Sequence, residues 1–527
     1  MDTAWENFLE AIAALMSRAL TDKETEKVIA GFTNFQQRLQ RLSSHNLQRL
    51  NLEITQSAKR VSKCKHEGKT CKQNVTRGFI KTWLVAYLGK YLLGVLPSVV
   101  SGKVLKDPSI LKKGGGSDTV SFAFFLSSFL SAYKAVLCTM RYVRPQHEGD
   151  RLNAFVAGSV AGLTLFLDKD KGRRTAITLY LFTRAIQFGS SYSMKKWAEH
   201  RDRKRAIHHQ AEREAVDLAG RKQELVTKNA WDDILAKGMS ASAATVVMSL
   251  TASVIIYSCV LEPTAMPVSY WKFIMTQSGL PQKFGPMFVP LLETFRSQFH
   301  ILRELPRGVD NMGIPAGVSS RDFVAENISP NIATLIPSNV HHDYQLCALL
   351  HPLTPCTGHA MDVITGEFGR AAKMYGTLNL IVTLVFHHKK LATNPNEVVH
   401  RYIKSTLRSC LFLTVYVLNA FYTPCVLRRV LKKESLFIYI FNGLLSGLAV
   451  LIEAPGRQME LALYCLPRAL ETVWNMMLKR GMVRNIRNGD VMLFSASMGV
   501  LMTLYQNDPS VINKHYLTVL TRVFGRN

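Results

Sequence analysis

The chain has 527 residues, of which 47% are hydrophobic, and a formal net charge of +27. It is longer than one compact domain usually is, and its apolar residues gather in runs of about 20, which indicates membrane helices joined by solvated loops. The positive charge does not follow one face as in a nucleic-acid-binding protein. Instead, 13 Lys or Arg lie in 1–77 and 11 lie in 194–238, beside apolar runs. We therefore expect no nucleic acid among its partners.

The first 77 residues predict an amphipathic helical N-terminal region that ends in a Cys/His segment. Apolar residues recur there at helical spacing, as at Trp5, Phe8 and Ile12. Such a helix either packs on the membrane domain as a cap or lies on the lipid surface, and the sequence leaves both open. The acidic start of the chain is unlike a secretory signal or a cleavable mitochondrial presequence.

Ten apolar segments follow in two groups of five. Membrane repeat 1 (78–262) has segments at about 78–100, 120–140, 153–167, 175–193 and 239–261, with the charged, mostly helical basic loop 194–238 before the last of them. Residues 263–355 hold 11 of the 19 prolines and predict an irregular connector with one short helix around Phe295. Membrane repeat 2 (356–510) has segments at about 372–388, 407–427, 436–452, 459–477 and 490–506, and a C-terminal tail (511–527) follows.

The two groups share a motif. Residues 158–185 read GSVAGLTLFLDKDKGRRTAITLYLFTRA, and residues 443–469 read GLLSGLAVLIEAPGRQMELALYCLPRA. The matching positions are Gly158 with Gly443, Gly162 with Gly447, Asp168 with Glu453, Gly172 with Gly456, Arg173 with Arg457, Tyr180 with Tyr464, and Arg184 with Arg468. Agreement at so many positions indicates an internal duplication. The expected fold class is therefore all-α: a polytopic membrane helical bundle made of two duplicated halves of about five apolar segments each.

The paired glycines, four residues apart on apolar helices, predict helix packing. This spacing lets two backbones approach closely in lipid, so we expect Gly158, Gly162, Gly443 and Gly447 to pack the two halves together. The alternative is an interface between copies of the chain, because the sequence does not fix the oligomeric state.

The carboxylates that follow the glycines predict hairpins. Asp168 and Glu453 precede turns that contain Gly172-Arg173 and Gly456-Arg457. Two antiparallel helices joined by such a turn place the charges at the water interface.

Arg184 and Arg468 lie 12 residues beyond the turn glycines, about 18 Å along a helix. That depth is near the middle of a bilayer, where a charge usually faces a cavity or a partner. With Tyr180 and Tyr464 they form a candidate site for an anionic lipid or metabolite. The alternative is a structural arginine bonded to backbone carbonyls, with Glu471 partly neutralising Arg468.

Thiols and imidazoles recur where each half enters its apolar region. These candidate ligands are Cys64, His66 and Cys71 in the first half and Cys347, His351, Cys356 and His359 in the second. Their spacing is irregular compared with closed zinc sites, so we expect no metal and no other cofactor. No phosphate loop, nucleophile elbow or dinucleotide fingerprint is present, which argues against an enzyme.

The second half, from HPLTPCTGHAMDVITGEFGR through GLLSGLAVLIEAPGRQMELALYCLPRA, resembles the transmembrane protein 135 family. The glycine helices with the following Gly-Arg turn are more distantly similar to the mitochondrial inner-membrane translocase (Tim17/Tim22-type) family. The N-terminal Cys/His segment looks like the cysteine-containing N-terminal module of the first family. This resemblance implies a peroxisomal or mitochondrial membrane protein linked to fatty-acid metabolism and organelle dynamics, and it provides no catalytic residues.

Three functions remain open from the sequence. The first is support of lipid metabolism by transporting or organising an anionic lipid or metabolite. The second is a non-transporting scaffold that recruits protein partners through its basic loops. The third is a protein-translocation component. All three require an integral membrane protein that contacts membrane lipid.

Overall fold

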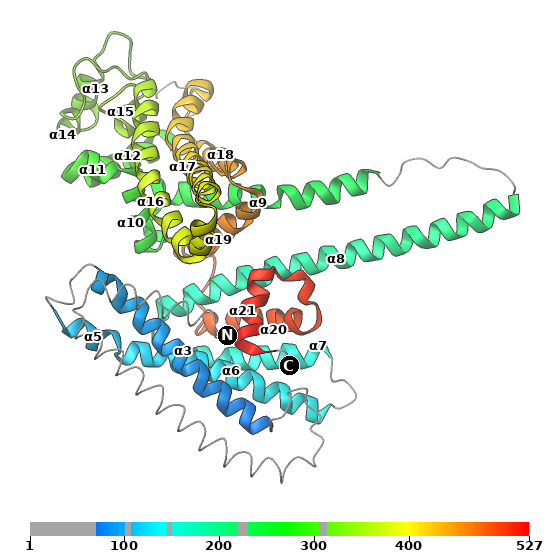
Figure 1. Ribbon diagram of the computed structural model, residues 1–527. Helices are drawn as coiled ribbons and strands as arrows, with labels where there is room; N and C mark the ends of the chain where they lie inside the picture. Colours follow the sequence, from blue (N-terminus) through cyan, green and yellow to red (C-terminus); the bar gives the residue numbers. More distant parts are fainter. Residues whose placement is uncertain (1–69, 101–106, 145–149, 220–229, 305–312, 526–527) are drawn as a thin grey trace.

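The computed structural model describes residues 70–100, 107–144, 150–219, 230–304 and 313–525 (Figure 1). Within these ranges the regular structure is helical, apart from one isolated bridge between Gly313 and Tyr344. The all-α fold class is thus confirmed. The predicted N-terminal helical region lies outside the described residues up to position 69, and so do Cys64 and His66.

The first half forms helices over each of its five apolar segments. The five segments lie in α3 (Cys71–Val100), α6 (Ser117–Val143), α7 (Arg151–Gly162) with the 3-10 helix η2 (Leu163–Leu167), α8 (Lys171–Ala219) and α9 (Ala230–Leu261). The short helix α5 (Ser109–Gly114) lies between α3 and α6. The Asp150 carboxylate caps α7 by accepting a hydrogen bond from the backbone N–H of Leu152. Much of the basic loop is a continuation of α8 and α9, which both extend beyond the bundles in the same direction (Figure 1).

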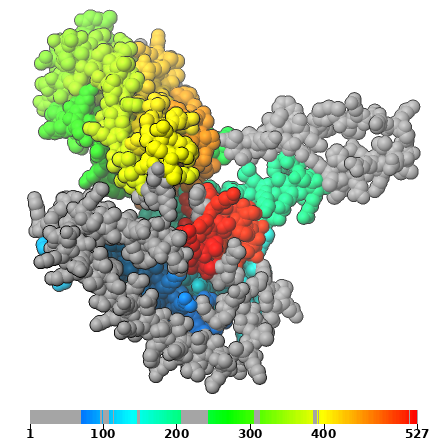
Figure 2. Space-filling view, in the orientation of Figure 1, coloured from blue at the N-terminus to red at the C-terminus, as the bar shows by residue number. Residues whose placement is uncertain are grey.

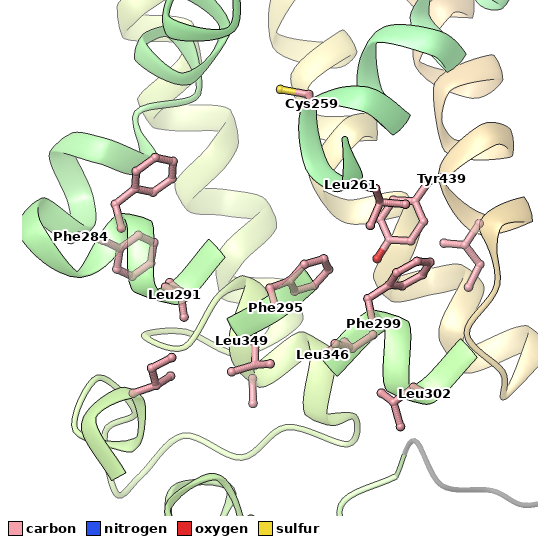
Figure 3. Packing of buried hydrophobic residues seen from close by; sticks show 14 of the residues in the cluster. Cys259, Leu261, Phe284, Leu291, Phe295, Phe299, Leu302, Leu346, Leu349 and Tyr439 are labelled. Atoms are coloured by element: carbon pink, nitrogen blue, oxygen red, sulfur yellow. The ribbon is translucent and has the colours of Figure 1, made fainter. Parts of the chain in front are cut away.

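Residues 263–355, which the sequence predicts to be an irregular connector, are largely helical instead. They contain η3 (Pro263–Ala265), α10 (Val268–Ser278), α11 (Leu280–Phe284), η4 (Gly285–Met287), α12 (Phe288–Glu304), α13 (Ser320–Asn327), α14 (Pro330–Ala333) and α15 (Gln345–Leu350). The predicted short helix is α12, and its Phe295 and Phe299 side chains pack with Leu346, Leu349 and Tyr439 (Figure 3). Several prolines lie at the first or second position of these short helices, most of which contribute to one hydrophobic core.

The second half forms the remaining helices. They are α16 (Cys356–Thr393), α17 (Pro395–Leu431), α18 (Leu436–Gly447), η5 (Leu448–Ile452), α19 (Pro455–Lys479), α20 (Gly489–Asn507), η6 (Pro509–Val511) and α21 (Lys514–Phe524). The predicted C-terminal tail therefore contains a helix. Its Phe524 ring packs edge-on against Phe129 and Tyr133 of α6.

The last predicted apolar segment of each half packs with the opposite half. Helix α20 lies against α7 and α8, whereas α9 lies against α18 and α19. We call α3, α6, α7, α8, α20 and α21 the first bundle, and α9, α16, α17, α18 and α19 the second bundle. Figure 2 shows the C-terminal residues in red beside the blue and cyan residues, while green, yellow and orange residues form the other lobe. The bundles meet where α8 contacts α19.

Fewer helices qualify as membrane spans than the ten predicted apolar segments. In the part of the chain that the structure describes, Ser109–Val143, Ser242–Leu261 and Pro395–Leu431 are long and apolar enough to cross a membrane. Arg151–Leu167 and Leu436–Ile452 are apolar but shorter. In both of these segments the α-helix stops before the 3-10 turn, η2 or η5, that forms the last residues. Charged residues interrupt several of the other apolar segments, as Lys81 and Lys90 do in α3.

Large apolar side chains are exposed along several bundle helices. Examples are Leu93 at 76%, Val430 at 72% and Leu451 at 60% of full exposure. A protein surrounded by water rarely leaves so many large apolar groups open, whereas contact with lipid tails satisfies them. These faces and the three candidate spans indicate a membrane protein.

Candidate functional site

The paired glycines lie where helices of the two halves approach each other closely. Gly158 and Gly162 of α7 face α20, and Gly443 and Gly447 of α18 face α9. A Cβ added at Gly162 would lie 2.5 Å from the Ser495 Cα, and one at Gly447 would overlap the Ser249 backbone. Each glycine pair therefore packs against a helix from the other half of the sequence, and at these positions no side chain fits between the two backbones.

The turns themselves do not depend on glycine. Gly172 and Gly456 lie in the first turns of α8 and α19, and neither has a positive φ. The chain reverses instead through η2 and η5, which follow the glycine helices directly.

The two motif carboxylates are buried and do not face water. Asp168 is fully buried and accepts a hydrogen bond of 2.7 Å from Arg173 Nε, while Arg173 also pairs with Asp118 of α6 at 2.8 Å. Glu453 is 2% exposed and accepts a hydrogen bond from the Ser409 hydroxyl of α17. Arg457 lies 3.6 Å from Glu453. Each motif thus fastens its turn to the neighbouring long helix of its own bundle.

Arg184 is buried between the two bundles. Its guanidinium donates to Glu460 of α19 at 2.7 Å and to Gln187 at 2.8 Å. It lies over the rings of Tyr516, at 4.6 Å, and Tyr180, at 5.2 Å. The positive charge is therefore neutralised by a carboxylate of the second bundle, which the hairpin spacing alone could not reveal.

Arg468 does not join Arg184 in one site. It pairs with Glu471 at 3.0 Å, three residues further along α19, and Tyr464 is 67% exposed. The structure therefore does not bring the four residues of the candidate anion site together. Tyr180 bonds instead to the Tyr516 hydroxyl at 3.0 Å.

We expect the Arg184–Glu460 pair to hold the two bundles together. Arg184→Met should lower the free energy of unfolding by about 2 kcal/mol, because a charged hydrogen bond is lost and Glu460 stays partly desolvated. Combining it with Glu460→Met should recover part of that loss. Thermal unfolding of the detergent-purified variants measures both effects, and strictly additive losses would contradict the pairing.

A second cluster gathers thiols and an imidazole. One ligand atom each from Cys347, His351, Cys356 and Cys425 lies within 4.8 Å of the others, and all four side chains are buried. The His351 Nδ1 lies 2.9 Å from the Thr354 carbonyl oxygen, and its Nε2 lies 3.3 Å from the Cys425 Sγ. Such a set of soft ligands could hold a metal ion.

Prolines fix the elements that carry these four side chains. Pro352 disfavours helix at the residue before it, so α15 ends at Leu350 and His351 caps it, and Pro355 precedes the first residue of α16, Cys356. Pro424 inside α17 has no N–H, and the Ala420 carbonyl that it leaves free accepts a hydrogen bond of 2.8 Å from the Asn442 amide.

The sequence-based candidates match this cluster only in part. Cys347, His351 and Cys356 belong to it, while Cys71 lies on α3 of the first bundle. His359 stacks on His351 with 4.6 Å between ring centroids, and burial lowers the pKa of His359 to about 3. Cys425 was missed because its position in an apolar run reads as packing. The one signal was the proline beside it.

A groove lies between α10–α11 and α16, with a volume of about 770 Å³. Its lining residues are Thr276, Gln277, Gly279, Gln282, Arg370, Lys373, Met374, Thr377, Leu378 and Ile381. Arg370 is bound to the Gln277 carbonyl at 2.7 Å and to Glu367 at 2.9 Å. Burial raises the pKa of Glu367 to about 7. The groove therefore combines exposed apolar side chains with two basic groups.

Comparison with known families singles out the same part of the chain. Residues 342–478, about a quarter of the chain, match the model for the N-terminal cysteine-rich region of Transmembrane protein 135. The match contains all four residues of the Cys/His cluster and all of α16 to α18. It does not include the Cys/His segment before residue 78, where the sequence suggested this module. No solved structure matches the chain. Residues 342–478 are thus similar to the cysteine-rich region of the transmembrane protein 135 family, which supports the family resemblance of the second half.

Proposed function

We propose that the chain is a multi-spanning membrane protein of peroxisomes or mitochondria that supports lipid metabolism by binding an anionic lipid in the groove on α16. The observation that carries this proposal is the composition of the groove. Lys373 lies near one end, exposed and with no bonding partner among the described residues. Leu378 and Ile381, 52% and 55% exposed, continue the same wall.

The groove suits an amphiphile better than a small polar metabolite. From Lys373 to Ile381 the wall rises about 12 Å along the helix, long enough to follow a stretch of acyl chain. A basic side chain near a lipid surface attracts an anionic group by about 1 kcal/mol. The expected occupant is therefore a fatty-acyl lipid whose carboxylate or phosphate lies at Lys373 and Arg370.

We further propose that the two halves of the chain arose by duplication. Helices α7, η2 and α8 occur in the same order as α18, η5 and α19. In both cases the glycine pair faces a helix of the other half of the chain. This arrangement makes the halves interdependent, because the first bundle includes α20 and α21 of the second half and the second bundle includes α9 of the first half.

Cross-linking with a photoreactive fatty acid tests the lipid proposal. We expect Lys373→Glu to reduce labelling of the groove about tenfold, equivalent to about 1.4 kcal/mol. Labelling of the wild-type chain should increase as the pH falls through about 7, because protonation of Glu367 then removes a negative charge beside the groove.

Lys390→Glu is the matched control. Lys390 is exposed on the same helix, about 25 Å further along, and the substitution makes the same change of charge. Labelling that is equal in the wild type and both variants would contradict the lipid site. That outcome would favour the scaffold alternative, in which the projecting ends of α8 and α9 recruit protein partners.

A further inference from the structure

We propose that Cys347, His351, Cys356 and Cys425 bind one Zn²⁺ ion as a closed structural centre. The inference does not depend on the lipid groove. Three cysteines and one histidine are a common ligand set for structural zinc. A tetrahedral site with Zn–S bonds of about 2.3 Å places its sulfurs about 3.8 Å apart. The four ligand atoms, all within 4.8 Å of one another, need only small side-chain adjustments to reach that geometry.

The surrounding groups orient and stabilise such a site. The Thr354 carbonyl is 2.9 Å from His351 Nδ1, which fixes the tautomer with its proton on Nδ1 and leaves Nε2 free to bind a metal. Arg428 Nη1 lies 3.7 Å from the Cys347 Sγ and would offset the negative charge of a thiolate there. The ring N–H of a metal-bound histidine that faces away from the metal usually donates to a carbonyl or carboxylate, as that of His351 does to Thr354.

Burial argues that the cluster is more than an accidental group of thiols. Cys347 and Cys425 are 1% exposed, and His351 is 2% exposed. Thiols and an imidazole that are shielded from water in this way suit a closed structural site.

Zinc fits better than the other chemistries open to these residues. A disulfide would join two of the three thiols and leave the third thiol and the imidazole unused. All four ligand positions come from the protein, so no coordination site remains for a substrate, which favours a structural over a catalytic ion. The ion would connect α15, the start of α16 and the C-terminal part of α17. It would thereby fix α16, which also lines the groove.

Metal analysis of the full chain, purified in detergent under reducing conditions, tests the proposal. We expect about one zinc per chain, and at least a tenfold loss in Cys347→Ser and in Cys425→Ser. Cys410→Ser is the matched control, because Cys410 is equally buried on the same helix as Cys425 but lies outside the cluster. His351→Cys should keep zinc through a fourth thiolate, whereas His351→Phe should not.

Cobalt gives a measurement that does not depend on variants that fold poorly. Co²⁺ added to the metal-free wild-type chain should produce the visible bands of a tetrahedral ion and a sulfur-to-cobalt charge-transfer band. Absence of these bands together with absence of zinc would overturn the proposal. So would a disulfide among the three cysteines, iron with inorganic sulfide in the purified chain, or zinc that Cys410→Ser lowers as much as Cys425→Ser does.

Discussion

Alanine at Gly447 is expected to separate α18 from α9 and to remove most of the folded protein. A Cβ there would overlap the Ser249 Cα, which belongs to the backbone and cannot rotate away. We expect a loss of about 3 kcal/mol or more, since overpacking outweighs the gain of about 1 kcal/mol in helix propensity. Gly162→Ala should have a similar effect at the contact of α7 with Ser495. Thermal unfolding in detergent, monitored as the loss of the monodisperse fraction, measures the stability of both variants.

Gly189→Ala on α8 is the matched control. Gly189 is also helical, but a Cβ added there would meet nothing within 4 Å. Alanine should therefore leave stability unchanged or raise it by up to about 1 kcal/mol. If Gly447→Ala and Gly189→Ala unfold at the same temperature, the close packing of α18 on α9 is wrong.

The second large effect is expected at Arg428, which is fully buried inside the second bundle. Its Nε donates to Glu434 at 2.7 Å and its Nη2 donates to the Tyr439 hydroxyl at 2.9 Å. Arg428→Leu leaves the buried Glu434 carboxylate without its counter-charge. Breaking such a pair costs about 3–5 kcal/mol. The same unfolding measurement should show this loss.

The adjacent arginine provides the comparison. Arg429 pairs with Asp343 at 3.0 Å, but both side chains are about half exposed. Arg429→Leu should therefore cost less than about 1 kcal/mol. The double variant Arg428→Leu with Glu434→Leu should be more stable than Arg428→Leu alone, because no buried charge remains. Equal losses for the two single arginine variants would contradict the buried pair.

Local patterns in the sequence predict the helices well. Every predicted apolar segment is helical, because apolar runs of that length favour helices and repeated small residues mark close packing. The sequence leaves the number of full spans open, since an apolar run does not reveal where a 3-10 turn such as η2 ends it. In residues 263–355 only α12 was predicted, and the other helices were missed. Frequent prolines read as irregular chain although they can begin short helices.

Contacts between distant segments could not be read from the sequence. Glu460 neutralises Arg184 from 276 residues away, and Cys425 completes the cluster from α17. Neither residue stands out in its own segment. The exchange of α9 and α20 between the halves is likewise a property of the tertiary arrangement, which two matching sequence motifs do not determine.

The most direct test of the account is where the protein resides. The chain, tagged at its C-terminus and expressed at its native level, should fractionate with peroxisomal or mitochondrial membranes and stay in the pellet after alkaline carbonate extraction. Retention is expected because the exposed apolar faces and the three candidate spans need lipid around them. Recovery in the plasma membrane or the endoplasmic reticulum would contradict the proposed organelle, and release by carbonate would contradict an integral membrane protein altogether.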